Sequence, residues 1–261
     1  MHTLITGASS GIGYELAKIC ASHGQNLILT ARSTDLLNKL SNELKIKFHT
    51  TIEVISMDLG KPGSALKLFE IIQEKKWEVN ILINNAGVGD HGSFSNSTLK
   101  KCNDMIQLNI ISLIELTHLF LPQMIKRKNG NILNVASTAA FQPGPYMSVY
   151  YATKSFVLNF SEALAEELNN TGVAVTTLCP GPTESGFQKA ANISNINVLK
   201  KAKLPSSKVV AEYAYSAMMK KEVVAIHGLK NRLLVQTIRF LPRSLIRKII
   251  ASIQLGRKDS L

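Results

Sequence analysis

Short apolar runs alternate with longer amphipathic runs along most of the chain. The apolar runs are rich in β-branched residues and nearly continuous, as strands are when both of their faces are covered. We predict strands over Thr3–Thr6, Asn26–Thr30, Thr51–Met57, Ile81–Asn84, Gly130–Ala136, Val173–Cys179 and Val223–Ile226. We predict helices over Ile12–Ser22, Asp35–Lys45, Ser64–Lys76, Leu99–Lys126, Tyr150–Asn169 and Ser206–Lys220. Strand–helix alternation of this kind predicts an α/β fold: one doubly wound sheet of seven parallel strands with helices on both faces.

Two segments depart from this rhythm. Residues Glu184–Pro205 are rich in Asn, Ser and Lys, and they follow the end of a predicted strand, where α/β sheets bind ligands. A loop of this length is either a lid or disordered, and we interpret it as a lid. No internal repeat or linker occurs, so we predict one domain over residues 1–228, followed by a helical extension over residues 229–261.

The extension is amphipathic and basic. Leu234, Ile238, Leu241, Leu245, Ile249 and Ile253 recur at helical spacing, and Pro242 divides the stretch into two helices. Such a helix can lie peripherally on an anionic membrane, cap a substrate pocket or bury its apolar side against a partner subunit. The pattern alone leaves these alternatives open.

Charge and composition narrow the function classes. The net charge is +12, and residues 220–261 hold 10 of the 30 Lys and Arg but 2 of the 18 Asp and Glu. The basic excess is therefore concentrated in the tail, and no motif or aromatic-interleaved basic patch predicts nucleic-acid binding.

The three cysteines are scattered, which is typical of a reducing compartment and predicts no disulfide framework and no metal site. With Met1 directly before the first predicted strand and no run of 18 apolar residues, we expect a cytoplasmic protein without a membrane span.

A glycine-rich turn joins the first predicted strand to the first predicted helix. Its spacing, Thr6-Gly7-x-x-x-Gly11-x-Gly13, allows a tight turn and a close approach of the backbone to a pyrophosphate. The helix N-terminus supplies amide donors and positive potential. We therefore predict a dinucleotide site at this turn, formed by Gly7, Ser9, Ser10, Gly11, Ile12 and Gly13.

Later strand ends complete this predicted site. The second strand ends at Ala31 and Arg32; an acid here would bind the 2′-hydroxyl of NAD, whereas Arg32 suits the 2′-phosphate of NADP(H), so we predict NADP(H) over NAD(H). Asp58 either accepts from the adenine amino group or caps a helix. The remaining candidates at the strand ends are Leu59, Asn85, Ala86 and Gly87.

Proton-transfer chemistry is indicated by Ser137 together with Tyr150-x-x-x-Lys154. Residues four apart share one face of a helix, and an ammonium beside a phenol lowers the pKa of that phenol. A tyrosine of this kind exchanges a proton with a carbonyl or an alcohol near neutral pH.

Taken together, these motifs resemble the short-chain dehydrogenase/reductase family, in particular its ketoacyl-reductase-like and hydroxysteroid-dehydrogenase-like members, over residues 1–185. The resemblance implies a Rossmann-like fold, with Tyr150 as the general acid or base and Lys154 lowering the Tyr150 pKa and binding the nicotinamide ribose. It implies that Ser137 donates to the substrate carbonyl and that Asn109 shapes a water relay. Residues implied beside the nicotinamide are Pro180, Gly181, Thr183 and Ser185.

The resemblance further implies a homodimer or homotetramer built on Leu99–Lys126 and Tyr150–Asn169, and NADP(H)-dependent reduction of a ketone or 3-oxoacyl carbonyl to a secondary alcohol. The alternative is a nucleotide-binding scaffold without turnover. Tyr151, next to Tyr150, is expected to be a packing or pocket-wall residue, and His91 and Phe94 either border the substrate or pack a surface loop.

Overall fold

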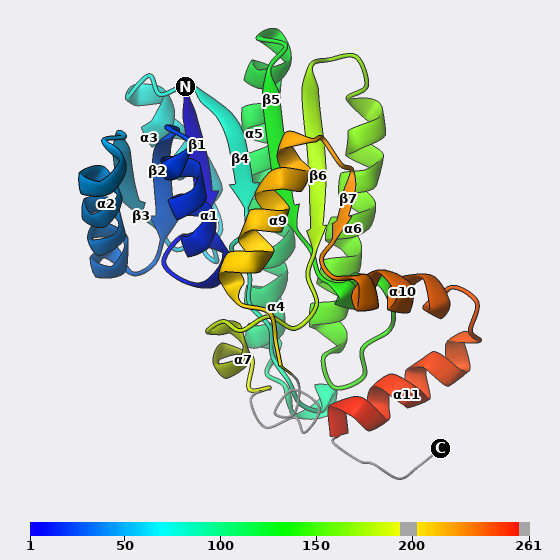
Figure 1. Ribbon diagram of the computed structural model, residues 1–261. Helices are drawn as coiled ribbons and strands as arrows, with labels where there is room; N and C mark the ends of the chain where they lie inside the picture. Colours follow the sequence, from blue (N-terminus) through cyan, green and yellow to red (C-terminus); the bar gives the residue numbers. More distant parts are fainter. Residues whose placement is uncertain (194–202, 256–261) are drawn as a thin grey trace.

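A single sheet of seven parallel strands organises the molecule. The computed structural model describes residues 1–193 and 203–255. The strand order is β3-β2-β1-β4-β5-β6-β7, which confirms the predicted doubly wound sheet (Figure 1). The strands are β1 (His2–Thr6), β2 (Asn26–Ala31), β3 (Ile52–Ser56), β4 (Val79–Asn84), β5 (Gly130–Val135), β6 (Val173–Cys179) and β7 (Val224–Ile226).

Helices cover both faces of the sheet. In Figure 1, α1 (Gly11–Ser22), α2 (Thr34–Phe48) and α9 (Ser207–Met219) lie in front, and α3 (Ser64–Glu74), α5 (Ser112–Lys126) and α6 (Ser148–Glu167) lie behind. Successive side chains of a strand point to opposite faces of the sheet, so neighbouring residues pack in different cores. Ile5 packs in the front core with Leu29 beside it, and Leu4 packs in the rear core with Ile28 beside it.

A π-helical turn interrupts the helix predicted over residues 99–126. It spans Gln107–Ile111 and joins α4 (Leu99–Ile106) to α5. Within the described residues, this is the one helix long and apolar enough to cross a membrane, with a mean hydropathy of 1.4. Its α5 portion packs against the rear of the sheet through buried side chains such as Phe120, and 39% of the apolar window is buried within the protein.

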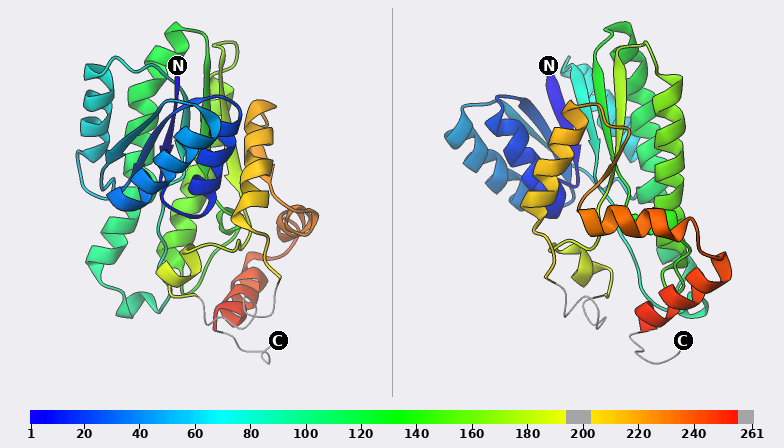
Figure 2. Two further views of the ribbon diagram at one scale, coloured as in Figure 1. Left: turned by 60° about the vertical axis from the view of Figure 1, so that its left-hand side comes forward. Right: turned by 45° about the vertical axis from the view of Figure 1, so that its right-hand side comes forward.

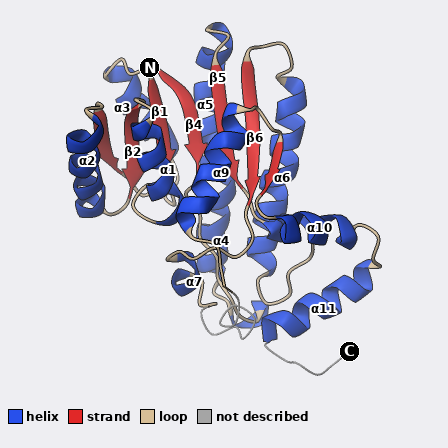
Figure 3. Cartoon of the chain, viewed as in Figure 1, coloured by secondary structure: helices blue, strands red, loops and turns tan. Residues whose placement is uncertain are grey.

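Irregular segments gather beyond the carboxyl ends of the strands, in the lower half of Figures 1 and 3. They include the turns η1 (Phe94–Asn96) and η3 (Thr138–Phe141) and the short helix α7 (Phe187–Ala190). Part of the predicted lid is therefore helical, and Glu184 bridges to Ser206 at its base. Its residues 194–202 lie outside the described residues.

The C-terminal run forms two helices, α10 (Leu229–Ile238) and α11 (Arg243–Leu255), as predicted from Pro242. The Pro242 carbonyl accepts from the Leu245 and Ile246 amides and thereby begins α11. Both helices lie past the strand ends, and Figure 2 shows α11 crossing this end of the molecule.

Candidate active site

A cavity of about 680 Å³ opens along the carboxyl ends of the strands. It is lined by the glycine turn, the ends of five strands, α7 and the two C-terminal helices. Eighteen of the predicted cofactor-binding and catalytic residues line it. They are Gly7, Ser9, Ser10, Gly11, Ile12, Arg32, Asp58, Leu59, Asn85, Ala86, Gly87, Ser137, Tyr150, Lys154, Pro180, Gly181, Thr183 and Ser185. The remaining two, Gly13 and Asn109, lie behind the wall.

The glycine turn is shaped for close approach. Gly7 and Gly11 have φ of 65° and 59°, the left-handed region that favours glycine. A Cβ on Gly13 would overlap Asn85 Nδ2 and the Gly7 carbonyl oxygen, so this glycine packs α1 against the turn rather than facing the cavity. Asn85 Nδ2 donates to the Thr6 and Gly7 carbonyls at 2.9 and 3.2 Å and holds the turn in place.

The first turn of α1 offers donors to an anion. Ser10 is the N-cap residue, but its side chain makes no capping bond. The first turn carries no acidic residue, so the positive potential of the helix N-terminus faces the cavity uncompensated. This combination fits the pyrophosphate of a dinucleotide.

The far end of the cavity holds Arg32, which is exposed and forms no ion pair within residues 1–193 and 203–255. Asp58 Oδ1 accepts from the Gly60 amide at 3.0 Å, so one carboxylate oxygen serves the local turn while the residue still lines the cavity. The expected helix-cap role is not observed, because the N-cap of α3 is Gly63. The second carboxylate oxygen of Asp58 is left for the predicted contact with adenine.

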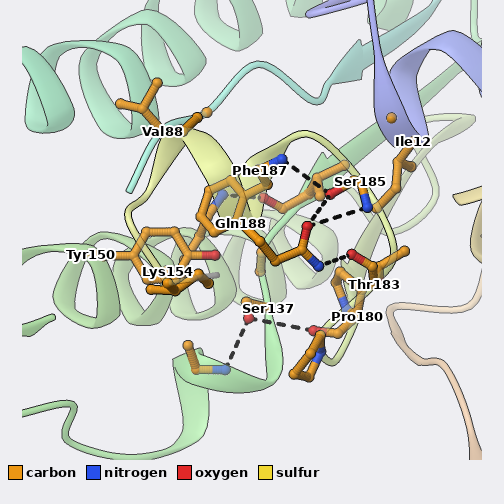
Figure 4. A pocket seen from close by; sticks show the side chains of 18 of the residues that line it. Ile12, Val88, Ser137, Tyr150, Lys154, Pro180, Thr183, Ser185, Phe187 and Gln188 are labelled. Atoms are coloured by element: carbon orange, nitrogen blue, oxygen red, sulfur yellow. Dashed lines mark hydrogen bonds between the residues drawn. The ribbon is translucent and has the colours of Figure 1, made fainter. Parts of the chain in front are cut away.

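Ser137, Tyr150 and Lys154 converge on one part of the cavity, although they come from different elements. Tyr150 and Lys154 follow one another on α6, and Ser137 begins η3 just after β5 (Figure 4). The Lys154 Nζ lies 5.9 Å from the Tyr150 ring centroid and donates to the Val135 carbonyl at 2.7 Å. Ser137 Oγ accepts from the Ala139 amide at 3.1 Å and donates to the Pro180 carbonyl at 3.4 Å.

The pKa of Tyr150 differs from the expectation. Burial raises it above 10, and a hydrogen bond from Ser137 opposes this shift only in part. Burial also lowers the pKa of Lys154 to about 8. The expected lowering of the Tyr150 pKa by Lys154 is therefore not seen in this structure, because the ammonium is bonded to the Val135 carbonyl and desolvation of the phenolate dominates.

Asn109 acts behind the wall. It lies in the π-helical turn, is buried, and pairs with both backbone polar groups of Val88: Oδ1 accepts from the amide and Nδ2 donates to the carbonyl, each at 2.9 Å. Nδ2 also donates to Thr153 Oγ1 at 3.1 Å. Asn109 therefore joins the β4 loop to α6 next to Lys154.

The segment after β6 holds two residues that the sequence pattern did not indicate. The Phe187 ring packs on Tyr150, with centroids 5.3 Å apart. Gln188 Nε2 donates to the Thr183 carbonyl, and its Oε1 accepts from the Ser185 amide at 3.3 Å (Figure 4). Gln188 thus shapes the loop predicted to flank the nicotinamide, and no periodicity or motif in the sequence marks it.

The C-terminal helices close the remaining side. Gln254 Nε2 donates to the Tyr151 hydroxyl at 3.1 Å, and the Gln254 carbonyl contacts His91 Nε2 at 3.2 Å. Tyr151 is thus a pocket-wall residue, as expected; His91 anchors α11, and Phe94 is 67% exposed and lies outside the cavity lining. The lining residues of these helices are Asn231, Leu234, Ile238, Leu241, Ile246, Ile249, Ile250, Ile253 and Gln254.

Comparison with known proteins places these features in a family. The pattern described as short chain dehydrogenase matches residues 1–195. The ketoacyl reductase HetN of Nostoc sp. (strain PCC 7120) is 30% identical over 224 residues, which cover 85% of this chain and 77% of that protein.

Two further comparisons agree. The human very-long-chain 3-oxoacyl-CoA reductase is 35% identical over 185 residues, 68% of this chain, and the match spans only 57% of the human protein. A short-chain dehydrogenase from Sphingobium yanoikuyae, solved in complex with NADPH, superimposes with a TM-score of 0.82 at 30% identity, covering 92% of this chain and 94% of that one.

Proposed function

The chain belongs to the short-chain dehydrogenase/reductase family of NAD(P)-dependent oxidoreductases, and from this premise we propose that it uses NADP(H) to reduce a hydrophobic ketone or 3-oxoacyl carbonyl to a secondary alcohol. The observation that carries the proposal is the convergence of Ser137, Tyr150 and Lys154 on the same cavity as the glycine turn. We assign this activity to a catalytic domain over residues 1–228, with the extension over residues 229–261 covering the pocket.

The residues present fit a dinucleotide. The backbone of Gly7 and Gly11 leaves room for a pyrophosphate, and the α1 amides with the uncommitted Ser10 hydroxyl supply donors. One carboxylate oxygen of Asp58 remains for the adenine end. Thr183 and Ser185 also line the cavity, and we assign them to the nicotinamide.

Arg32 supports NADP(H) over NAD(H). Its guanidinium has no ion-pair partner in the described part of the chain, and it borders the cavity beside Ser33, the N-cap of α2, whose side chain makes no capping bond. Ala31 stands where an acid would repel a 2′-phosphate. A guanidinium and a free hydroxyl at a helix N-terminus are suited to a phosphate rather than to a neutral hydroxyl.

Proton delivery is assigned to Tyr150. When bound, the nicotinamide supplies hydride to the carbonyl carbon. The Tyr150 hydroxyl donates its proton to the carbonyl oxygen, and Ser137 Oγ donates a hydrogen bond to the same oxygen as negative charge develops there. Burial raises the Tyr150 pKa, so the phenol carries its proton at neutral pH, the state that a general acid requires.

Lys154 and Asn109 support this proton donor. The buried Lys154 Nζ lies 5.9 Å from the Tyr150 ring centroid, and we assign Lys154 to binding the nicotinamide ribose beside that tyrosine. Asn109 holds the backbone of Val88 against α6 and is assigned, with Lys154, to the path that returns a proton to Tyr150. The inner faces of α10 and α11, which present Ile238, Ile250 and other apolar side chains, suit a hydrophobic substrate.

Substitution of two adjacent tyrosines, one at a time, tests the proposal. Tyr150→Phe removes the proton donor and should lower kcat by at least about a hundredfold, whereas Tyr151→Phe, a change of the same size on the same helix, should retain kcat within about tenfold. The assay is NADPH absorbance with a panel of 3-oxoacyl thioesters and bulky ketones. Unchanged kcat in Tyr150→Phe would contradict the mechanism. NADPH binding without turnover of any carbonyl by the wild-type protein would support the scaffold alternative.

Assembly and location complete the proposal. We propose a cytoplasmic homodimer or homotetramer built on the α4–α5 and α6 surfaces, where Leu99 and Phe156 are 74% and 38% exposed. Size-exclusion chromatography with light scattering measures the oligomer. We further propose peripheral contact with a membrane through the extension.

A further inference from the structure

The exposed side chains of α10, α11 and the turn between them that do not line the cavity have an unusual composition. Their apolar members are large: Phe240 is 85%, Leu229 71% and Leu233 60% exposed. Interspersed with them are basic side chains, and residues 229–255 contain no Asp or Glu. We define the outer surface as Leu229, Lys230, Leu233, Arg239, Phe240, Arg243, Leu245, Arg247 and Lys248.

The basic members of the outer surface are not used by the fold. None of Lys230, Arg239, Arg243, Arg247 and Lys248 forms an ion pair with any residue of 1–193 or 203–255. Arg232 on the same helix shows the contrast: it donates to the Ile226 carbonyl at 3.0 Å and to the Tyr213 hydroxyl at 2.7 Å. The outer surface therefore presents uncompensated positive charge around exposed hydrophobic side chains.

Other side chains of the same helices line the cavity. Leu234, Ile238 and Ile249 border it, while Leu233 and Phe240 are exposed and lie outside its lining. Figure 2 shows α10 and α11 forming the edge of the molecule beside the strand ends. One pair of helices thus separates the proposed substrate pocket from whatever covers the outer surface.

We propose that the outer surface docks on an anionic lipid bilayer, with Phe240 and Leu233 entering the headgroup–acyl boundary and the five basic side chains contacting lipid phosphates. This composition, apolar anchors surrounded by Lys and Arg without acids, is that of an interfacial helix. The orientation brings the pocket wall formed by α10 and α11 against the membrane. If the proposed function holds, the enzyme then receives its hydrophobic carbonyl substrate from the lipid phase.

Charge argues against a second copy of the chain as the occupant. A symmetric dimer through this surface would pair like with like and bring two sets of five uncompensated cations together. An anionic bilayer neutralises the same charges and also accepts the exposed rings and methyl groups. The lipid surface therefore satisfies both features, whereas self-association satisfies only the apolar one.

Co-sedimentation of the full-length protein with vesicles tests the proposal, without cofactor or substrate. We expect binding to phosphatidylcholine vesicles containing phosphatidylglycerol, weak binding to phosphatidylcholine alone, and release as salt increases. Arg243→Gln with Arg247→Gln should weaken binding about twenty-fivefold, from about fivefold per charge, and Phe240→Ser about tenfold.

Matched controls lie on α2, on another side of the molecule. Lys45→Gln with Lys47→Gln removes two exposed charges, and Ile46→Ser removes an apolar side chain that is 78% exposed. These variants should bind vesicles like the wild type. Circular dichroism and the reduction of a water-soluble ketone check that all variants remain folded, because none of the altered residues lines the cavity.

Three outcomes would overturn the proposal. The first is equal binding of the wild type to neutral and anionic vesicles, and the second is an equal loss of vesicle binding in the α2 control variants. The third is a wild-type dimer that Phe240→Ser dissociates while no vesicle binding occurs, which would identify the surface as an interface between copies of the chain. A failed Tyr150→Phe test would reject the proposed reaction and leave vesicle binding unaffected, so the two proposals fail separately.

Discussion

Lys154 is a buried cation, and its position predicts a measurable dependence of stability on pH. The side chain is in the core between Tyr150 and β5, and burial lowers its pKa from 10.5 to about 8. Lys154→Met removes the titrating group and keeps much of the apolar stem. The comparison of wild type with this variant, both without cofactor, isolates the contribution of the ammonium.

The sign follows from proton linkage. Below pH 8 the lysine is protonated in the folded and the unfolded states, so stability does not change with pH and the cost of burying the ammonium is at its full value. Between about pH 8 and 10.5 the unfolded chain still binds the proton and the folded protein does not, so stability increases with pH. At about 1.4 kcal/mol per pH unit the full contribution is about 3 kcal/mol, and about 2 kcal/mol of it appears between pH 7 and 9.5.

Urea denaturation at these two pH values measures the effect. The free energy of unfolding of the wild type, relative to Lys154→Met, should rise by about 2 kcal/mol from pH 7 to 9.5. Tyr150 and Cys179 titrate nearby, and burial raises the pKa of both, but they are present in both proteins and largely cancel. The exposed Lys45, changed to Met, should show no such rise. A constant difference, or one that shrinks as pH increases, would refute a buried, desolvated Lys154.

Three further predictions concern the cofactor site and the packing beneath it. Arg32→Asp removes a charge-assisted contact and should raise the KM for NADPH at least about tenfold. The KM for NADH should stay unchanged or decrease. Steady-state kinetics with both cofactors measures this, and a wild-type preference for NADH would show that the assignment is wrong. Gly13→Ala should destabilise by about 1–3 kcal/mol in thermal denaturation, because its Cβ would overlap Asn85 and the Gly7 carbonyl. Asn109→Ala leaves both Val88 backbone groups unpaired and should lower the free energy of unfolding by about 2 kcal/mol, and an unchanged urea midpoint would argue against this role.

The fold was largely predictable because the strands are buried on both faces. The bounds of β6 agree with the prediction, and the other strands differ by at most two residues at either end. The π-helical turn at Gln107–Ile111 was not predicted, since the apolar pattern of residues 99–126 is also that of one continuous helix. No Gly or Pro marks the turn, and the Val88 backbone groups that its Asn109 binds lie in a distant loop.

The site was predictable where a motif sets the spacing, and not where contacts are made by the fold. The turn from Gly7 to Gly13 and the pair Tyr150 and Lys154 follow from local geometry. The bond of Lys154 to the Val135 carbonyl does not, because it depends on how α6 lies on β5. The raised pKa of Tyr150 follows from burial, which the chain order does not reveal.

The C-terminal run shows why periodicity left several alternatives open. An apolar stripe at helical spacing predicts that one face of the helix is buried, but it does not identify the partner that buries it. In the structure Leu234 and Ile238 of α10 line the cavity, while Leu233 of α10 and Phe240 in the turn after it are exposed and lie outside that lining. Capping the pocket and contacting a membrane therefore use different side chains of this run, so the two alternatives are compatible. A change confined to one set should leave the role of the other intact, which is why Phe240→Ser can weaken vesicle binding while the pocket that receives the carbonyl keeps its lining.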